Sequence, residues 1–281
     1  MASTLDIRRR IRSVKNTAQI TKAMQMVAAS KMRKAQAAAR AGRPYYEALN
    51  RVLGALRGKV DPLANPLLVE RPVSRELIVV VSTDKGLCGP LNTNLFRELA
   101  GVDSSRTTFI AVGRKGLQYL ARTRRQVLAD FAASEVPRFR EIRPVATFCA
   151  EKFLSGEVDQ VSVLYPKFIN TLNQQPTLAR LLPVQADLES GEKLTGGEFV
   201  FEPDENSVLG AILPHYLNYE IYQMVLDARA SEHSARMVAM KNATDNAKQL
   251  VKDLTLEYNK IRQASITTEL LEISTAQLAD Q

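Results

Sequence analysis

Two long stretches, one at each end of the chain, contain neither glycine nor proline. They cover residues 1–41 and 215–281, and as continuous helices they would be about 60 Å and about 100 Å long. Helices of globular proteins average about 11–12 residues, so helices of this length are typical of coiled coils or helical repeats. We find no internal repeat of about 20–50 residues that would favour a repeat protein. The sequence therefore predicts a coiled coil.

Both stretches carry small and apolar residues at alternating steps of three and four, the heptad pattern of a coiled coil. In the N-terminal stretch these positions are Ile7, Ile11, Val14, Ala18, Thr21, Gln25, Ala28, Met32, Ala35, Ala39, Gly42, Tyr46, Leu49, Leu53 and Leu56. In the C-terminal stretch they are Leu226, Ala230, His233, Met237, Met240, Thr244, Ala247, Val251, Leu254, Tyr258, Ile261, Ser265 and Thr268. The pattern predicts left-handed supercoiling, with small residues that let the helices approach closely.

The two stretches flank a different kind of sequence, so we expect them to pair within one chain, in antiparallel directions. The C-terminal helix is the longer of the two, and its last turns should project past its partner. Those turns still carry large apolar residues, namely Ile266, Leu270, Leu271, Ile273 and Leu278. A projecting helix with apolar side chains needs a partner outside the chain.

The middle of the chain, about residues 75–205, predicts an α/β domain. We expect strands at Glu76–Ser82, Thr107–Val112 and Gln160–Tyr165, with Pro176–Val184 and Phe199–Glu202 as further candidates. Helices are expected at Leu91–Leu99, Lys115–Arg122 and Ile142–Leu154. Strands that alternate with short helices favour a small, open, mostly parallel sheet.

The expected fold class is therefore mixed, α plus α/β. It combines a long antiparallel two-helix coiled coil, formed by the N- and C-terminal helices, with a central small Rossmann-like α/β domain. We expect the N-terminal coiled-coil helix at residues 1–59, a linker at 60–74, the α/β domain at 75–206 and the C-terminal coiled-coil helix at 207–281.

Positive charge is concentrated near the N-terminus. The net charge is +8, yet residues 1–59 hold fourteen Lys or Arg against Asp6 and Glu47, a net +12, and the other residues are net −4. This predicts either an acidic partner (nucleic acid, anionic lipid or acidic protein) or simply a solvated helix face. The sequence has no Trp and only 6% aromatic residues, which disfavours a base-stacking surface.

No motif in the sequence indicates a catalytic, cofactor-binding or metal site. The loop Ser82–Pro90 after the first expected strand lacks both common phosphate-binding glycine patterns, and Pro90 has no N–H to offer, so a tight structural turn is the favoured interpretation. His215 and His233 are isolated, and Cys88 and Cys149 have no partners at metal-ligand spacing. Both Cys are expected to be small buried residues.

Membrane and targeting signals are weak. The most continuous apolar run is Leu77–Val81, far short of the roughly 18 residues that a membrane span needs. Residues 1–40 are Arg-rich and acid-poor like a transit peptide, but the pattern continues into the body of the chain. We therefore expect no transit peptide. This favours the cytoplasmic face of a bacterium over an organelle as the location.

Four segments carry a specific resemblance. Asp6–Lys34, Ser82–Asn92, Ser231–Asn246 and Tyr258–Ile273 resemble the corresponding parts of the gamma subunit family of F-type, proton-translocating ATP synthases. The resemblance implies a central rotary stalk whose coiled coil sits inside the ring of alpha and beta subunits. It also implies that the α/β domain forms a foot, together with the epsilon subunit, on the membrane ring of c subunits.

The resemblance implies a subunit that catalyses nothing, with no cofactor and no metal, because the nucleotide sites of such enzymes lie on beta. It would transmit torque, couple proton transport to ATP synthesis, and regulate ATPase activity and proton flow, as a peripheral protein on the cytoplasmic side of the cell membrane. By the same resemblance, contacts with beta are expected from Met24, Lys31, Arg262, Gln263, Thr267, Glu269 and Glu272. No nucleic acid and no direct membrane insertion are expected, nor is a thiol switch.

Two other readings remain open from the residues alone. The first is a coiled-coil scaffold or nucleic-acid-binding protein with an α/β appendage, which would bind polyanions with a steep salt dependence. The second is a small α/β enzyme with helical arms, which would require convergent titratable groups at the strand ends. Capture of alpha, beta and epsilon subunits by the chain would discriminate between them and the rotary stalk.

Overall fold

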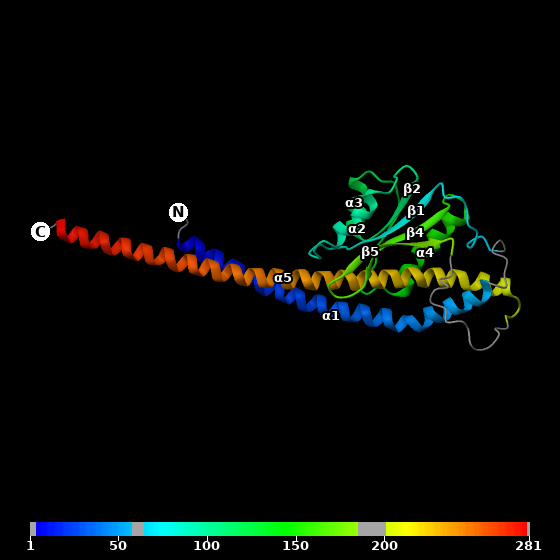
Figure 1. Ribbon diagram of the computed structural model, residues 1–281, viewed down its shortest axis with the longest axis horizontal. Coiled ribbons are helices and arrows are strands. Elements are labelled where there is room, and N and C mark those ends of the chain that lie inside the picture. Colours follow the sequence, from blue (N-terminus) through cyan, green and yellow to red (C-terminus); the bar gives the residue numbers. More distant parts are fainter. Residues whose placement is uncertain (1–3, 58–64, 185–200, 280–281) are drawn as a thin grey trace. The chain divides into compact units, whose positions relative to one another are not determined.

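The computed structural model describes residues 4–57, 65–184 and 201–279 (Figure 1). In chain order the elements are α1 (Thr4–Arg57), β1 (Glu76–Val81), α2 (Leu91–Ala100), β2 (Thr107–Val112), α3 (Arg114–Arg122), β3 (Val127–Phe131), α4 (Phe139–Leu154), β4 (Gln160–Phe168), β5 (Gln174–Leu182) and α5 (Glu205–Ala279). The chain forms two compact units. A helical unit contains residues 1–27 and 237–281, and a larger unit contains residues 28–236.

In the helical unit, α1 and α5 run antiparallel. The hydroxyl oxygens of Thr21 and Thr244 lie 2.7 Å apart and share a hydrogen bond. Nearer the start of α1, the Arg8 guanidinium carbon lies 5.9 Å from the ring centroid of Tyr258. Moving back along α1 therefore means moving forward along α5, which confirms the predicted antiparallel coiled coil.

The predicted heptad positions form the contact surface of this unit. Between residues 5 and 23 of α1, the side chains that are not exposed are those of Ile7, Ile11, Val14, Ala18 and Thr21. On α5 the buried positions are Met240, Thr244, Ala247 and Leu254, and Ile261 is half-buried. The pattern thus predicted which side of each helix would be covered, because helical periodicity alone decides which residues share a face.

The last two heptad positions predicted for the C-terminal helix do not belong to the contact surface between the helices. Ser265 and Thr268 are exposed, so the contact surface between α1 and α5 ends at Ile261. The reason is the length of the partner: α1 begins at Thr4, and the pairing of Arg8 with Tyr258 leaves no α1 residue to face the last turns of α5. The predicted projection of α5 past its partner is confirmed.

In the larger unit, the second half of α1 and the first half of α5 are also antiparallel. The Tyr219 hydroxyl donates a 2.7 Å hydrogen bond to the Gly42 carbonyl, and the rings of Tyr46 and Tyr216 stack with centroids 6.1 Å apart. A Cβ at residue 42 would lie 2.0 Å from the Tyr219 hydroxyl oxygen. Glycine at this position therefore allows the close approach that the hydrogen bond needs.

The larger unit contains a five-stranded sheet with the order β3-β2-β1-β4-β5. The pairs β1/β2, β1/β4 and β2/β3 are parallel, and β4/β5 is antiparallel. Val79 of β1 is in register with Ile110 of β2 and with Val163 of β4. The predicted mostly parallel sheet is confirmed, and its strand order, which the sequence did not predict, places β1 at the centre.

Both faces of β1 are covered. Leu77, Val79 and Val81 belong to the larger core cluster, which contains residues of α4 and α5, whereas Ile78 and Val80 pack with residues of α2 and α3. Burial on both faces explains why β1 is a continuous apolar run rather than an alternating one.

Two strand predictions differ from the structure. β3 (Val127–Phe131) was not predicted, because this short edge strand has mostly half-buried residues and one exposed residue, and therefore no clear hydrophobic pattern. Of the expected strand Phe199–Glu202, residues 199–200 lie outside the described residues, while Phe201 and Glu202 are not in a strand. The domain boundaries at residues 59, 74 and 206 stay predictions.

Candidate functional site: the end of α5 and the loop after β1

The last described turns of α5 expose large apolar side chains. From Arg262 to Leu271 every side chain is exposed, and the exposed fractions of Ile266, Leu270 and Ile273 are 49%, 62% and 58%. The side chain of Leu278 lies outside the described residues. Apolar side chains repeated along one exposed helix are typical of a surface that binds another protein.

Five of the seven predicted beta-contact residues lie on this last part of α5. The Thr267 hydroxyl donates a 2.9 Å hydrogen bond to the carbonyl of Gln263, and Glu269 accepts one of 3.2 Å from the Ser265 hydroxyl. The Arg262 guanidinium carbon lies 5.9 Å from the Tyr258 ring centroid. Glu272 is within α5, but its side chain lies outside the described residues. The interactions are local to the helix, which leaves these side chains accessible.

The two remaining predicted contact residues are on α1. Met24 is half-buried in the helical unit. Lys31, in the larger unit, forms an ion pair with Glu135, and Lys85 Nζ lies 3.4 Å from the other carboxylate oxygen. The hydrogen bond from Lys31 and the nearby Lys85 hold the pKa of the Glu135 carboxyl below its usual value. Lys31 is therefore engaged within the chain, which the sequence did not indicate.

The loop Ser82–Pro90 is held by hydrogen bonds of its own. Asn92 Nδ2 donates to the Thr83 hydroxyl oxygen at 2.7 Å, and that hydroxyl donates to the carbonyl of Lys85 at 2.8 Å. Leu87 and Gly89 have φ angles of 63° and 58°. Internal bonds of this kind support the interpretation of a structural turn.

A buried ion-pair network joins this loop to α5. The side chain of Arg229 is only 4% exposed and its two terminal nitrogens contact Glu232 Oε2 at 2.7 Å and Asp84 Oδ2 at 3.2 Å. The second of these nitrogens also donates to the carbonyl of Ala133 at 2.6 Å. Glu232 is paired in addition with Arg236 at 2.7 Å. The network fixes the loop after β1 against α5.

The sequence singled out Cys88 and Cys149 as buried residues, and the structure confirms it. Burial raises the pKa of the Cys149 thiol to about 12. Burial also raises the pKa of Cys88, although nearby Arg236 opposes the shift. Because the thiolate is the reactive form, both residues are poorly suited to redox chemistry in the folded chain.

We expect Cys149 to be unreactive toward a thiol-specific disulfide reagent at mildly alkaline pH as long as the chain is folded. In guanidinium chloride both thiols should react. The measurement is the number of thiols titrated before and after unfolding, with Cys88→Ala as the variant that isolates Cys149. Rapid reaction of Cys149 in the folded variant would contradict the burial-based argument.

Within residues 4–57, 65–184 and 201–279, no group of three or more His, Cys, Asp or Glu could hold a metal ion. Over the same residues no helix is both long and apolar enough to cross a bilayer. His233 is buried, and burial lowers the pKa of its imidazole, whereas His215 is exposed.

A long helix pair with an exposed apolar end, together with a small α/β domain, indicates a protein that contacts other proteins. A family model described as ATP synthase matches residues 3–279. The chain is 54% identical to the ATP synthase gamma chain of Opitutus terrae and 50% identical to that of Methylacidiphilum infernorum, each over 99% of both chains. The chain therefore belongs to the ATP synthase gamma chain family, and the resemblance inferred from the sequence is confirmed.

Solved structures give the same result for the fold. The chain resembles one from the central stalk and c-ring of the Tetrahymena thermophila mitochondrial ATP synthase, with a TM-score of 0.62, 27% identity and coverage of 80% of this chain and 99% of that one. It also resembles one from the rotor of the Euglena gracilis mitochondrial ATP synthase, with a TM-score of 0.66, 23% identity and coverage of 94% and 98%.

Proposed function

We propose that this chain is the central rotary stalk of an ATP synthase. It transmits torque between the proton-driven rotation of a c-subunit ring and the conformational cycling of catalytic beta subunits, and so couples proton transport to ATP synthesis. It regulates ATPase activity and proton flow through the same contacts, and it performs no catalysis itself. The family membership and the projecting, apolar end of α5 support this role.

The observation that carries the proposal is the pair of antiparallel helices in the helical unit, of which one extends beyond the other. At the end where α5 extends beyond α1, only one helix is present, so the pair has no rotational symmetry about its long axis there. Rotation of a shaft with an asymmetric end presents a different surface to each surrounding subunit in turn. The exposed Ile266, Leu270 and Ile273 are suited to low-friction contact, because apolar surfaces form no directional bonds that rotation must break.

The proposed partners are the alpha and beta subunits around the helical pair, and the epsilon subunit and the c-ring at the α/β domain of residues 75–206. The net +12 of residues 1–59 suits an acidic surface on beta. Arg262, Gln263, Thr267, Glu269 and Glu272 would contact beta at the upper end, and Met24 and Lys31 lower down. The location we propose is the cytoplasmic face of a bacterial membrane, as a peripheral subunit.

The test has two stages: purification of the assembled complex, and then measurement of its proton pumping. The tagged full-length chain, co-expressed with alpha, beta, epsilon and c subunits, should be purified as a complex that couples ATP hydrolysis to proton pumping in vesicles. Omission of the chain should abolish pumping. Failure to capture alpha and beta, or tight binding to nucleic acid with a steep salt dependence instead, would overturn the proposal.

Met24→Lys should impair coupling more than ATP hydrolysis. The added ammonium would pair with the acidic surface of beta, and this pair must break at each step of rotation. One exposed ion pair is worth up to about 1 kcal/mol, a roughly fivefold effect on a rate or an equilibrium, so the ratio of protons pumped to ATP hydrolysed should fall by no more than about fivefold. The measurement is the ratio of the pumping rate to the hydrolysis rate in the same vesicles.

Met24→Leu is the matched control, because it changes the shape of the side chain slightly and adds no charge. It should leave the ratio unchanged. An equal loss of pumping and of hydrolysis in Met24→Lys would show that the substitution damages assembly rather than coupling.

A further inference from the structure

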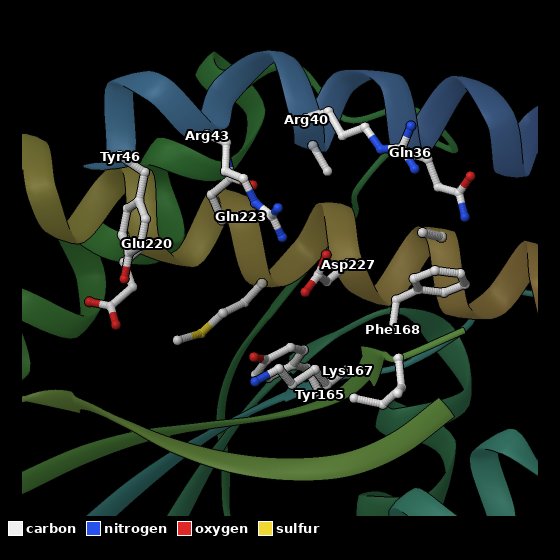
Figure 2. A pocket seen from close by; sticks show the side chains of 14 residues that line it. Gln36, Arg40, Arg43, Tyr46, Tyr165, Lys167, Phe168, Glu220, Gln223 and Asp227 are labelled. Atoms are coloured by element: carbon white, nitrogen blue, oxygen red, sulfur yellow. The ribbon is translucent and has the colours of Figure 1, made fainter. Parts of the chain in front are cut away.

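The larger unit contains a cavity that the proposed rotary function does not use. It lies between α1, α5 and the end of β4, and its volume is about 450 Å³ (Figure 2). This volume falls within the roughly 300–1,000 Å³ range of small-molecule sites. Each of its lining residues lies between Gln36 and Ala230, so the cavity belongs to one compact unit.

Three cationic side chains line the cavity. Arg40 and Arg43 are three residues apart on α1, which places them on one helix face, and Lys167 comes from β4 (Figure 2). All three are exposed. Among the described residues none of the three forms an ion pair or a hydrogen bond. Their charge is therefore not neutralised by a contacting carboxylate of the described residues.

A carboxyl group lies among these cations. Asp227 extends from α5, and Figure 2 shows it between Arg43 on one side and Lys167 on the other. Burial raises the pKa of Asp227, and the charges of Lys167 and Arg43 partly oppose this shift. Glu220 of α5 and Tyr165 of β4 also line the cavity. Asp227 forms no hydrogen bond or ion pair with the described residues, so its carboxyl is open to a ligand.

Apart from the amides Gln36 and Gln223, the rest of the lining is apolar or aromatic. Tyr46 of α1, Phe168 of β4 and Met224 of α5 contribute their side chains. A site that combines cations with aromatic surface is suited to a molecule that has an anionic group attached to an organic body. Arginine in particular matches the oxygen geometry of phosphate, with which it can form two parallel hydrogen bonds.

We propose that this cavity binds a small organic phosphate, whose phosphate group lies among Arg40, Arg43 and Lys167, and that Asp227 takes up a proton when the ligand binds. The ionised carboxylate would repel the phosphate, whereas the protonated carboxyl can donate a hydrogen bond to a phosphate oxygen. Binding should therefore be stronger at lower pH. The charged and titratable groups that line the cavity with Asp227 are Arg40, Arg43 and Tyr46 of α1, Lys167 and Tyr165 of β4, and Glu220 of its own helix.

The test is isothermal titration calorimetry of the full-length chain with phenyl phosphate. Saturable binding at one site is expected, and inorganic phosphate, which lacks the organic body, should bind less tightly. Arg43→Gln and Lys167→Gln should each weaken binding roughly tenfold, the loss typical of a charge-assisted hydrogen bond. Arg97→Gln is the matched control: Arg97 is an exposed arginine of α2 outside the cavity, and its removal should leave affinity unchanged.

Asp227→Asn distinguishes the proposal from simple charge attraction. It should strengthen binding, and it should abolish proton uptake, measured with inorganic sulfate in two buffers of different ionisation enthalpy. Sulfate is used because its own protonation does not change near neutral pH. Circular dichroism verifies that each variant is folded. Absence of saturable heat, equal affinity of Arg43→Gln and the unsubstituted chain, or weaker binding by Asp227→Asn would each overturn the proposal.

Discussion

Gly113→Ala should lower the free energy of unfolding by about 3–5 kcal/mol, the combined cost of backbone strain and a steric clash. Gly113 precedes α3 with a φ of 105° and a ψ of 144°, a conformation that residues with a Cβ rarely adopt. A Cβ built there would lie 2.3 Å from the carbonyl oxygen of Ser82. That oxygen belongs to the backbone directly after β1, so it cannot rotate away.

The same region has a second constraint. The Ser82 hydroxyl accepts a 2.7 Å hydrogen bond from the backbone N–H of Gly116 and donates one of 3.2 Å to the carbonyl of Gly113. A displacement of residue 113 would therefore disturb the start of α3 as well as the end of β1. Both effects act in the same direction, toward destabilisation.

Gly101→Ala is the matched control for this substitution. Gly101 has a φ of −86°, and an added Cβ would meet no atom within 4 Å. Alanine at such a position restricts the unfolded chain and should be neutral or slightly stabilising. Chemical unfolding of the two variants, followed by circular dichroism, measures the difference. Equal midpoints for both would show that residue 113 tolerates a side chain and that the argument from φ is wrong.

Arg229→Ala should lower the free energy of unfolding by about 3 kcal/mol or more, because removing one partner of a buried ion-pair network leaves the remaining buried polar groups poorly compensated. The guanidinium contacts Glu232, Asp84 and the carbonyl of Ala133. Without it, Glu232 keeps one cation, Arg236, whereas the Ala133 carbonyl loses a buried donor. The loop after β1 would also lose its charged contact with α5.

Arg180→Ala is the control for Arg229→Ala. Arg180 also pairs with an acid, Glu70, at 3.7 Å, but both side chains are exposed. Exposed ion pairs contribute about 0–1 kcal/mol, so this variant should unfold almost like the original chain. Thermal unfolding of both variants gives the comparison. If Arg229→Ala lost no more stability than Arg180→Ala, the network would have no structural role.

Periodic features of this protein could be predicted from the sequence. Ile7, Ile11 and Val14 share one face of a helix whatever surrounds them, since 3.6 residues per turn is a local property of the backbone. The run Leu77–Val81 is apolar at every position, which predicted a strand there, and the structure adds that both of its faces are covered. The excess length of the C-terminal helix predicted the exposed end with Ile266 and Leu270.

Features that depend on residues far apart in the chain could not be predicted in this way. The strand order around β1 follows from how the crossover helices pack, and the edge strand β3 has no strong pattern of its own. The sequence placed Lys31 among the contacts with a partner, whereas in the structure it pairs with Glu135, more than 100 residues away in the sequence.

From local sequence alone one could predict which residues would be helical and which faces of the end helices would be apolar, and the sequence also showed which family the chain resembles. Helicity and the position of the apolar face arise from neighbours within a few turns. The three-dimensional fold was needed to show which charges meet, namely Arg229 with Asp84, Lys31 with Glu135, and Asp227 beside Arg43 and Lys167. Electrostatic interactions depend on distance in space and on burial, and neither quantity is encoded in local spacing along the chain.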